Sequence, residues 1–105
     1  MIPVTDKEIN SVTPELITVG ASEVVLSDTR LGKSRRIFYS IVPVTAGVIC
    51  TITFGDAPAV ALTGLPLGQY QPLIDCAGDT YQPYQGTIKC IASAGGQISI
   101  MERFE

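Results

Sequence analysis

The sequence predicts an all-β fold: a small antiparallel β-sandwich or jelly-roll-like barrel of seven to eight strands, with an extended N-terminal arm. No segment of ten or more residues has apolar residues spaced at i, i+3, i+4 and i+7, so helices are not expected. Short runs rich in β-branched and aromatic residues instead alternate with turns that contain glycine or proline. The 105 residues match the usual length of one domain.

The N-terminal part of the chain is expected to contain an arm and a first hairpin. Residues 1–14, MIPVTDKEINSVTP, contain two prolines and no sustained periodicity, which predicts an arm that orders only against a partner. The domain then occupies residues 15–105. Its first two strands are expected at residues 16–19 and 23–27, joined as a hairpin by a turn at residues 20–22.

Residues 35–56, RRIFYSIVPVTAGVICTITFGD, predict the longest strand pair, with a two-residue loop at Ala46-Gly47. The expected pairs on the inner side are Tyr39 with Phe54, Ile41 with Ile52, and Pro43 with Cys50. Because proline cannot donate a backbone hydrogen bond, Pro43 predicts that its strand lies at a sheet edge or is bulged at that residue.

The remaining segments predict a loop-rich middle and a terminal hairpin. A loop leads into a strand around residues 69–74, residues 75–84 form another loop, and strands follow at 87–92 and 97–104. We expect a three-residue loop, Ala94-Gly95-Gly96, with Gly96 at positive φ. This register pairs Ala92 with Ile98 and Cys90 with Ile100 on the inner side. It places Ile91 and Met101 on a half-apolar outer face, where we predict a subunit contact.

The composition favours association with another protein surface. Apolar residues make up 46% of the chain and charged residues 16%, below the usual share of about 25%, so part of the surface must be apolar. A net charge of −3 does not fit a partner that is nucleic acid or an anionic membrane. The one basic cluster, Lys33, Arg35 and Arg36, is expected in a solvated loop. The chain also lacks a signal-peptide pattern and a membrane-spanning run, which predicts a protein made in the cytoplasm.

The residue types that usually carry catalysis or bind metals are scarce. The chain has no histidine, and histidine is the usual general base near neutral pH, so we expect no enzyme activity. Four unplaced carboxylates leave a hydrolase as an alternative: Asp56, Asp75, Asp79 and Glu102. Asp75 and Asp79 are expected to cap turns rather than bind Ca²⁺, and no metal or cofactor is predicted. Of three cysteines without CxxC spacing, Cys50 and Cys90 are expected to be buried thiols.

Three tyrosines form the most suggestive surface feature of the sequence. Tyr70, Tyr81 and Tyr84 lie in the stretch GQYQPLIDCAGDTYQPYQG, among amide side chains. Such residues can pack loops onto the ends of a sheet, form a protein interface, or bind a glycan. All three readings remain open from the sequence.

The order of five segments in the chain resembles a small β-sandwich module of virion proteins from tailed bacteriophages. The segments are LITVGASEVVL, RRIFYSIV, ICTITFGD, GLPLGQYQPL and YQGTIKCIASAGGQISIMER. The resemblance covers residues 16–104 and lies in the TVG step at 18–20, the basic turn at 35–36, ITFG at 52–55, GLPL at 64–67 and YQGTI at 84–88. Residues 41–44, IVPV, depart from the polar residues that often end the long strand in these modules, and the loop at 75–84 is longer.

The resemblance implies a structural role without catalysis, as in head decoration (cement) proteins, head fibres and tail accessory proteins. We therefore expect a capsid decoration protein in the virion that forms a trimer or dimer. Its expected partner is the major capsid protein or another virion protein. The alternative is a carbohydrate- or receptor-binding module of a phage tail or fibre, based on the three tyrosines.

Overall fold

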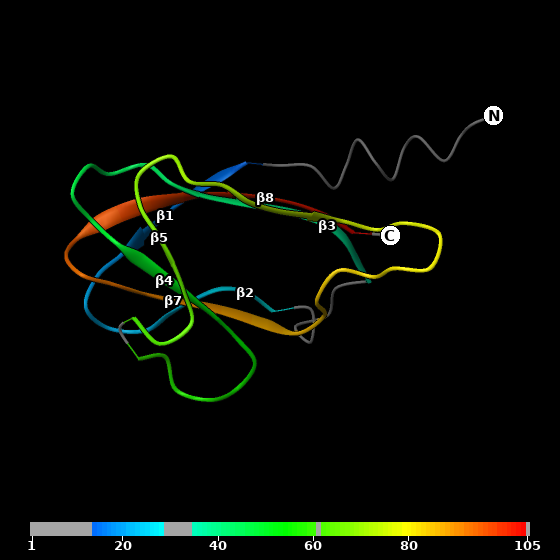
Figure 1. The fold of residues 1–105 in the computed structure, drawn as a ribbon, viewed down its shortest axis with the longest axis horizontal. Helices are drawn as coiled ribbons and strands as arrows, with labels where there is room; N and C mark the ends of the chain where they lie inside the picture. Colours follow the sequence, from blue (N-terminus) through cyan, green and yellow to red (C-terminus); the bar gives the residue numbers. More distant parts are fainter. Residues whose placement is uncertain (1–13, 29–34, 61, 105) are drawn as a thin grey trace.

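The computed structural model describes residues 14–28, 35–60 and 62–104, and the regular elements in these ranges are all β-strands (Figure 1). The all-β prediction is therefore confirmed, whereas all but the last residue of the expected arm lies outside the described residues. The strands are β1 (Glu15–Val19), β2 (Val24–Asp28), β3 (Arg36–Pro43), β4 (Cys50–Phe54), β5 (Leu65–Leu67), β6 (Leu73–Cys76), β7 (Thr87–Ala92) and β8 (Gly96–Phe104). In the described part of the chain, no helix is long and apolar enough to cross a membrane.

The strands form two four-stranded antiparallel sheets that pack face to face. The first, sheet A, has the order β1-β8-β3-β6, and the second, sheet B, has the order β2-β7-β4-β5. Figure 1 shows the sheets as two layers, with β8 and β3 above β7 and β2. Consecutive strands cross from one sheet to the other except at β4–β5. This arrangement is that of an eight-stranded jelly roll, one of the two architectures that the sequence predicted.

The three expected hairpins are wrong, because the two strands of each lie in different sheets. β1 pairs with β8, β3 pairs with β8 and β6, and β7 pairs with β2 and β4. Two smaller predictions fail with them. Gly96 is not among the described glycines at positive φ, and β3 is an interior strand of sheet A. Pro43 is tolerated there because it is the last residue of β3, beyond the point where β6 pairs.

The choice of inward-facing residues is nevertheless confirmed. Ile41, Ile52, Cys90 and Ile98 have at most 1% of their surface exposed and belong to one apolar core between the sheets. The residues expected as cross-strand partners belong to facing sheets instead. Tyr39 of sheet A and Phe54 of sheet B, for example, have ring centroids 6.4 Å apart.

The outer face of sheet B is covered in part by residues 55–60, the first part of the loop between β4 and β5. Lys89 of β7 donates from Nζ to the carbonyls of Asp56 at 3.1 Å and Ala57 at 2.9 Å. The same Nζ lies 3.3 Å from Glu23, whose other carboxylate oxygen accepts the Ala59 N–H at 2.8 Å. These contacts hold the loop against the sheet, so Lys89 is buried although it points away from the core.

Candidate interaction surfaces

The three predicted tyrosines do not form one surface. Tyr70 precedes β6 and is 68% exposed, whereas Tyr81 follows β6 at its other end and is 53% exposed. Tyr84 is partly buried against the core, where its ring meets Phe54 edge-on at a centroid distance of 5.1 Å. Tyr84 therefore packs a loop onto the sandwich, and Tyr70 and Tyr81 remain as two separate exposed side chains.

Tyr81 lines a polar hollow in the β6–β7 loop. The hollow has a volume of about 320 Å³ and is lined by Arg35, Gly78, Asp79, Thr80, Tyr81 and Gln82. The Tyr81 hydroxyl donates to Asp75, and this hydrogen bond raises the pKa of the phenol above its usual value. The loop is closed by the Gly78 N–H, which donates to the Tyr81 carbonyl at 3.0 Å. These hydrogen bonds fix the position of the Tyr81 ring beside charged, hydroxyl and amide groups.

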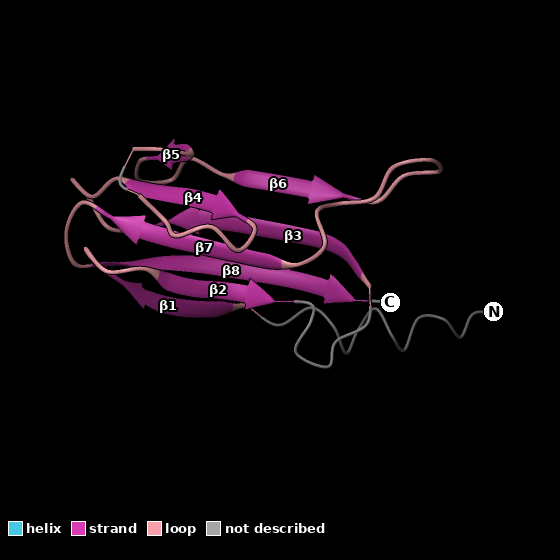
Figure 2. Ribbon diagram, turned by 90° about the horizontal axis from the view of Figure 1, so that it is seen from below, coloured by secondary structure: helices cyan, strands magenta, loops and turns pink. Residues whose placement is uncertain are grey.

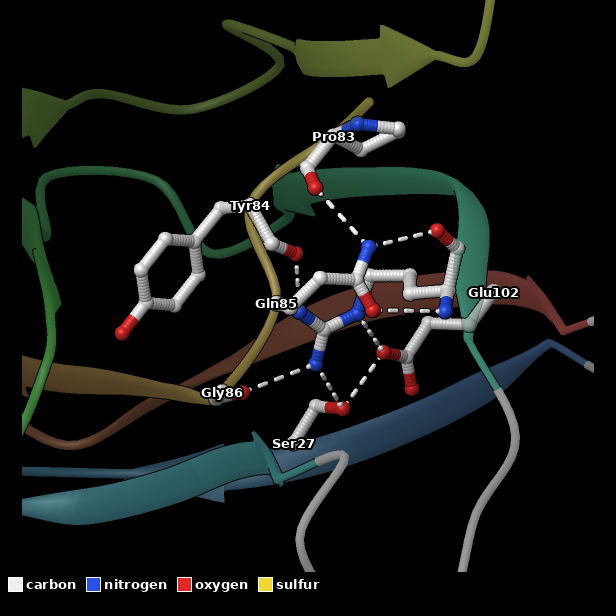
Figure 3. A network of polar contacts seen from close by, with 7 residues as sticks. Ser27, Pro83, Tyr84, Gln85, Gly86 and Glu102 are labelled. Atoms are coloured by element: carbon white, nitrogen blue, oxygen red, sulfur yellow. Dashed lines mark hydrogen bonds and ion pairs between the residues drawn. The ribbon is translucent and has the colours of Figure 1, made fainter.

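A buried arginine, Arg36, is the centre of a network of polar contacts, whose partners Ser27, Tyr84, Gly86 and Glu102 are labelled in Figure 3. Arg36 was expected in a solvated loop, but it begins β3 and none of its surface is exposed. The prediction fails because the pairing of β3 with β8 shifts register between Arg36 and Phe38, which allows Arg36 to point inward. Of the expected basic cluster, Arg35 is exposed and Lys33 lies outside the described residues.

The guanidinium of Arg36 uses most of its hydrogen-bonding capacity. Nε donates to Glu102 at 2.9 Å, Nη1 donates to the Tyr84 carbonyl at 2.6 Å, and Nη2 donates to Ser27 at 2.8 Å and the Gly86 carbonyl at 3.1 Å. The Ser27 hydroxyl also donates to Glu102. One side chain thus connects β2, β3, β8 and the segment before β7 (Figure 3).

Gln85 completes this connection through the backbone of Arg36. Its Oε1 accepts the Arg36 N–H at 2.8 Å, and its Nε2 donates to the carbonyls of Arg36 at 2.7 Å and Pro83 at 2.8 Å. The sequence gives no local signal for this arrangement, because every partner except Ser27, which is 9 residues away, lies 48 to 66 residues from Arg36.

The carboxylates considered for hydrolysis occupy separate contacts. Glu102 pairs with Arg36, and Asp75 accepts hydrogen bonds from Tyr81 and from the Cys76 N–H at 3.0 Å. Asp79 lines the hollow, and Asp56 lies within 3.5 Å of the Thr87 hydroxyl. In the described ranges, no three histidine, cysteine or acidic residues lie close enough to hold a metal ion.

The outer face of sheet A presents rows of mostly uncharged side chains. The register places Met101, Ser40 and Ile74 in one row across the sheet. Leu16, Ser99 and Val42 form a second row, and Arg103, Phe38 and Cys76 form a third. We call the apolar members of these rows the sheet A face: Leu16, Phe38, Val42, Ile74 and Met101. Leu16 is 60% exposed and Ile74 is 57% exposed, and Arg103 is the one charged residue in the rows.

The two residues predicted at a common subunit contact lie on opposite sides of the sandwich. Met101 belongs to the sheet A face, whereas Ile91 lies on the outer face of sheet B, opposite Thr51 of β4. Both are partly buried in the chain. They cannot form one hairpin contact as expected, although each still lies on an outer surface.

The chain was also compared with known protein families, sequences and structures. No family model, no curated protein sequence and no solved structure matches the chain.

Proposed function

We propose that this chain is a non-enzymatic structural protein of a tailed-phage virion, a capsid decoration (cement) protein that self-associates and binds capsid subunits. The observation that carries the proposal is the sheet A face, an apolar surface with little charge on a small jelly-roll domain. It is supported by the order of sequence segments that resembles virion modules.

The sheet A face has the properties of a protein-binding surface. The centres of protein interfaces are depleted of charged residues, and the three rows across sheet A contain Arg103 as their one charge. Four paired strands present these side chains, so little backbone freedom is lost on binding. On a capsid lattice, many copies bind together, and avidity strengthens a contact of modest affinity.

Binding to capsids tests the proposal. The purified chain, mixed with capsids that lack it, should co-sediment with them, and Ile74→Glu should abolish binding because it buries a charge at the contact. Val25→Glu is the matched control, since Val25 is also an exposed β-branched residue on an edge strand, but of sheet B. Absence of capsid binding, together with absence of the chain from the virion proteome, would contradict the proposal.

A second candidate function is carbohydrate or receptor binding at a phage tail or fibre tip. It is favoured by the polar hollow, where Tyr81 lies beside Arg35 and Asp79. Sugars bind where an aromatic face lies next to carboxylate and amide groups, which the hollow provides. On a glycan array, Tyr81→Ala should remove binding while Tyr70→Ala, at the other end of β6, should retain it. An array without signal would reject this candidate.

A further inference from the structure

Two exposed side chains are held by an unusual backbone. Among the described residues, the non-glycine positions with positive φ are Leu62 at 62° and Tyr70 at 61°. They are also the most exposed of the large apolar and aromatic residues, at 70% and 68%. A left-handed backbone is unfavourable for a residue with a Cβ atom, and an apolar side chain in water is unfavourable as well. Glycine would remove both penalties, so selection for folding alone does not explain these residues.

Hydrogen bonds fix the turns that present these two side chains. The Leu62 N–H donates to the Thr51 hydroxyl at 3.1 Å, and the Thr63 N–H donates to the Val60 carbonyl at 3.0 Å. The Tyr70 N–H donates to the Pro43 carbonyl at 2.8 Å. Both side chains are therefore presented by a defined backbone, which lowers the entropy lost when they are buried by a partner.

The two turns flank β5, which lies with β6 along one margin of the sandwich (Figure 2). We call the exposed apolar residues here the β5 margin: Ile49, Val60, Leu62, Leu65 and Tyr70. Their exposed fractions range from 38% to 70%. At roughly 200 Å² for a fully exposed large residue, they amount to about 540 Å² on one chain. Residues 57–74 contain no charged side chain.

We propose that the β5 margin binds the β5 margin of a second copy of this chain, with Leu62 and Tyr70 as the anchoring side chains. Complete burial of two such surfaces removes about 1,100 Å² from water, just above the lower limit of ~1,000 Å² for a specific interface. The chain carries a net charge of −3, so two copies repel, and the repulsion is weakest where charges are absent. A contact between identical patches has twofold symmetry and closes as a dimer.

The chemistry of β5 restricts the form of this contact. β5 is an edge strand of three residues with Pro66 at its centre, so the edge lacks a central N–H donor. Side chains rather than strand pairing must then hold the two copies together. The dimer cannot extend into a continuous sheet through this edge.

The test measures self-association of the full chain by sedimentation velocity over a dilution series. The inference rests on the self-association in the proposed function and not on capsid binding. Because the sample contains no capsid, dimer formation and capsid binding can fail independently. The parent chain should form a dimer. The double variant Leu62→Gly and Tyr70→Gly should dimerise at least tenfold more weakly, with an equal or higher Tm at concentrations where both proteins are monomeric. Val25→Ser, on the opposite margin, should dimerise like the parent.

A second double variant, Leu62→Asn and Tyr70→Asn, guards against misfolding of the first, because asparagine tolerates a left-handed backbone. It should show the same loss of dimer. A parent that stays monomeric up to millimolar concentration would overturn the inference. Glycine and asparagine variants that associate as tightly as the parent would also overturn it.

Discussion

Replacing Arg36 by methionine should destabilise the domain more than any change to a surface charge. The substitution keeps a long apolar stem but removes the partner of Glu102, whose side chain is only 12% exposed. It also removes the donors to the carbonyls of Tyr84 and Gly86. Breaking a buried ion pair from one side costs about 3–5 kcal/mol, because the remaining charge is left without compensation. We expect a loss in this range, a large part of the ~5–15 kcal/mol that stabilises a typical domain.

A second substitution distinguishes the cost of the unpaired Glu102 charge from the cost of the lost hydrogen bonds to carbonyl groups. In the double variant Arg36→Met and Glu102→Leu no buried carboxylate is left, so about 2 kcal/mol of stability should return. The return should be incomplete, because the carbonyls of Tyr84 and Gly86 still lack their donor and each buried acceptor costs about 1–3 kcal/mol.

Urea unfolding followed by circular dichroism and by tyrosine fluorescence measures these free energies, and coincident transitions would establish two-state behaviour. Arg103→Met is the matched control. The Arg103 guanidinium lies 5.8 Å from the Phe38 ring on the outer side of sheet A, so its loss should cost about 1 kcal/mol or less. The reasoning would be refuted if Arg36→Met lost no more stability than Arg103→Met, or if Glu102→Leu gave no recovery.

Three further predictions concern the thiols, one glycine and one phenol. The core contains two buried cysteines and the surface one exposed cysteine: Cys50, Cys90 and Cys76. Burial raises the pKa of both core thiols, that of Cys90 to about 12. A thiol reagent at pH 8 should therefore modify the exposed Cys76 quickly, and Cys50 and Cys90 only when the domain unfolds. Gly64→Ala should lower stability by about 1–3 kcal/mol, since a Cβ atom there would lie 2.6 Å from the Ile52 carbonyl oxygen, and circular dichroism during urea unfolding would show it. The pKa of Tyr81 is raised above 10.0 by Asp75, so this contact stabilises the fold below pH 10 and is lost as the phenol ionises. Absorbance at alkaline pH should show that Asp75→Asn lowers this pKa; an unchanged titration would mean that the contact is absent in solution.

The alternation of apolar and polar residues was sufficient to identify the inward side of most strands. It placed Ile41, Cys90 and Ile98 in the core, because a period of two assigns each residue to a face independently of its neighbours. It could not identify which strands pair. In a sandwich, two consecutive strands can direct the same residues into the core from different sheets. The expected hairpins and the observed crossovers therefore produce the same alternation of apolar and polar residues in the sequence.

The functional surfaces were less accessible to sequence reasoning for a related reason. In the sequence, Gly64 and Gly68 mark the turns around β5, yet Leu62 and Tyr70 also have positive φ there, and Gly68 does not. Residue type predicts where such a backbone is tolerated and not where the fold imposes it. The environment of Arg36 likewise depends on Glu102, 66 residues away. No local pattern contains that information.

The positions of β7 and β8 also determine when the chain can fold during synthesis. β8 lies between β1 and β3, and β7 lies between β2 and β4, so four of the six strand pairings in the described structure require residues after Gly86. A ribosome-bound chain that ends before Thr87 can form only the pairs β3–β6 and β4–β5. The other strands cannot form most of their pairs until the central strands β7 and β8 have been synthesised. The delay makes folding slow and leaves apolar segments of the nascent chain exposed to aggregation. A deletion within β7 should therefore divide sheet B, and a deletion within β8 should divide sheet A, rather than shorten one edge.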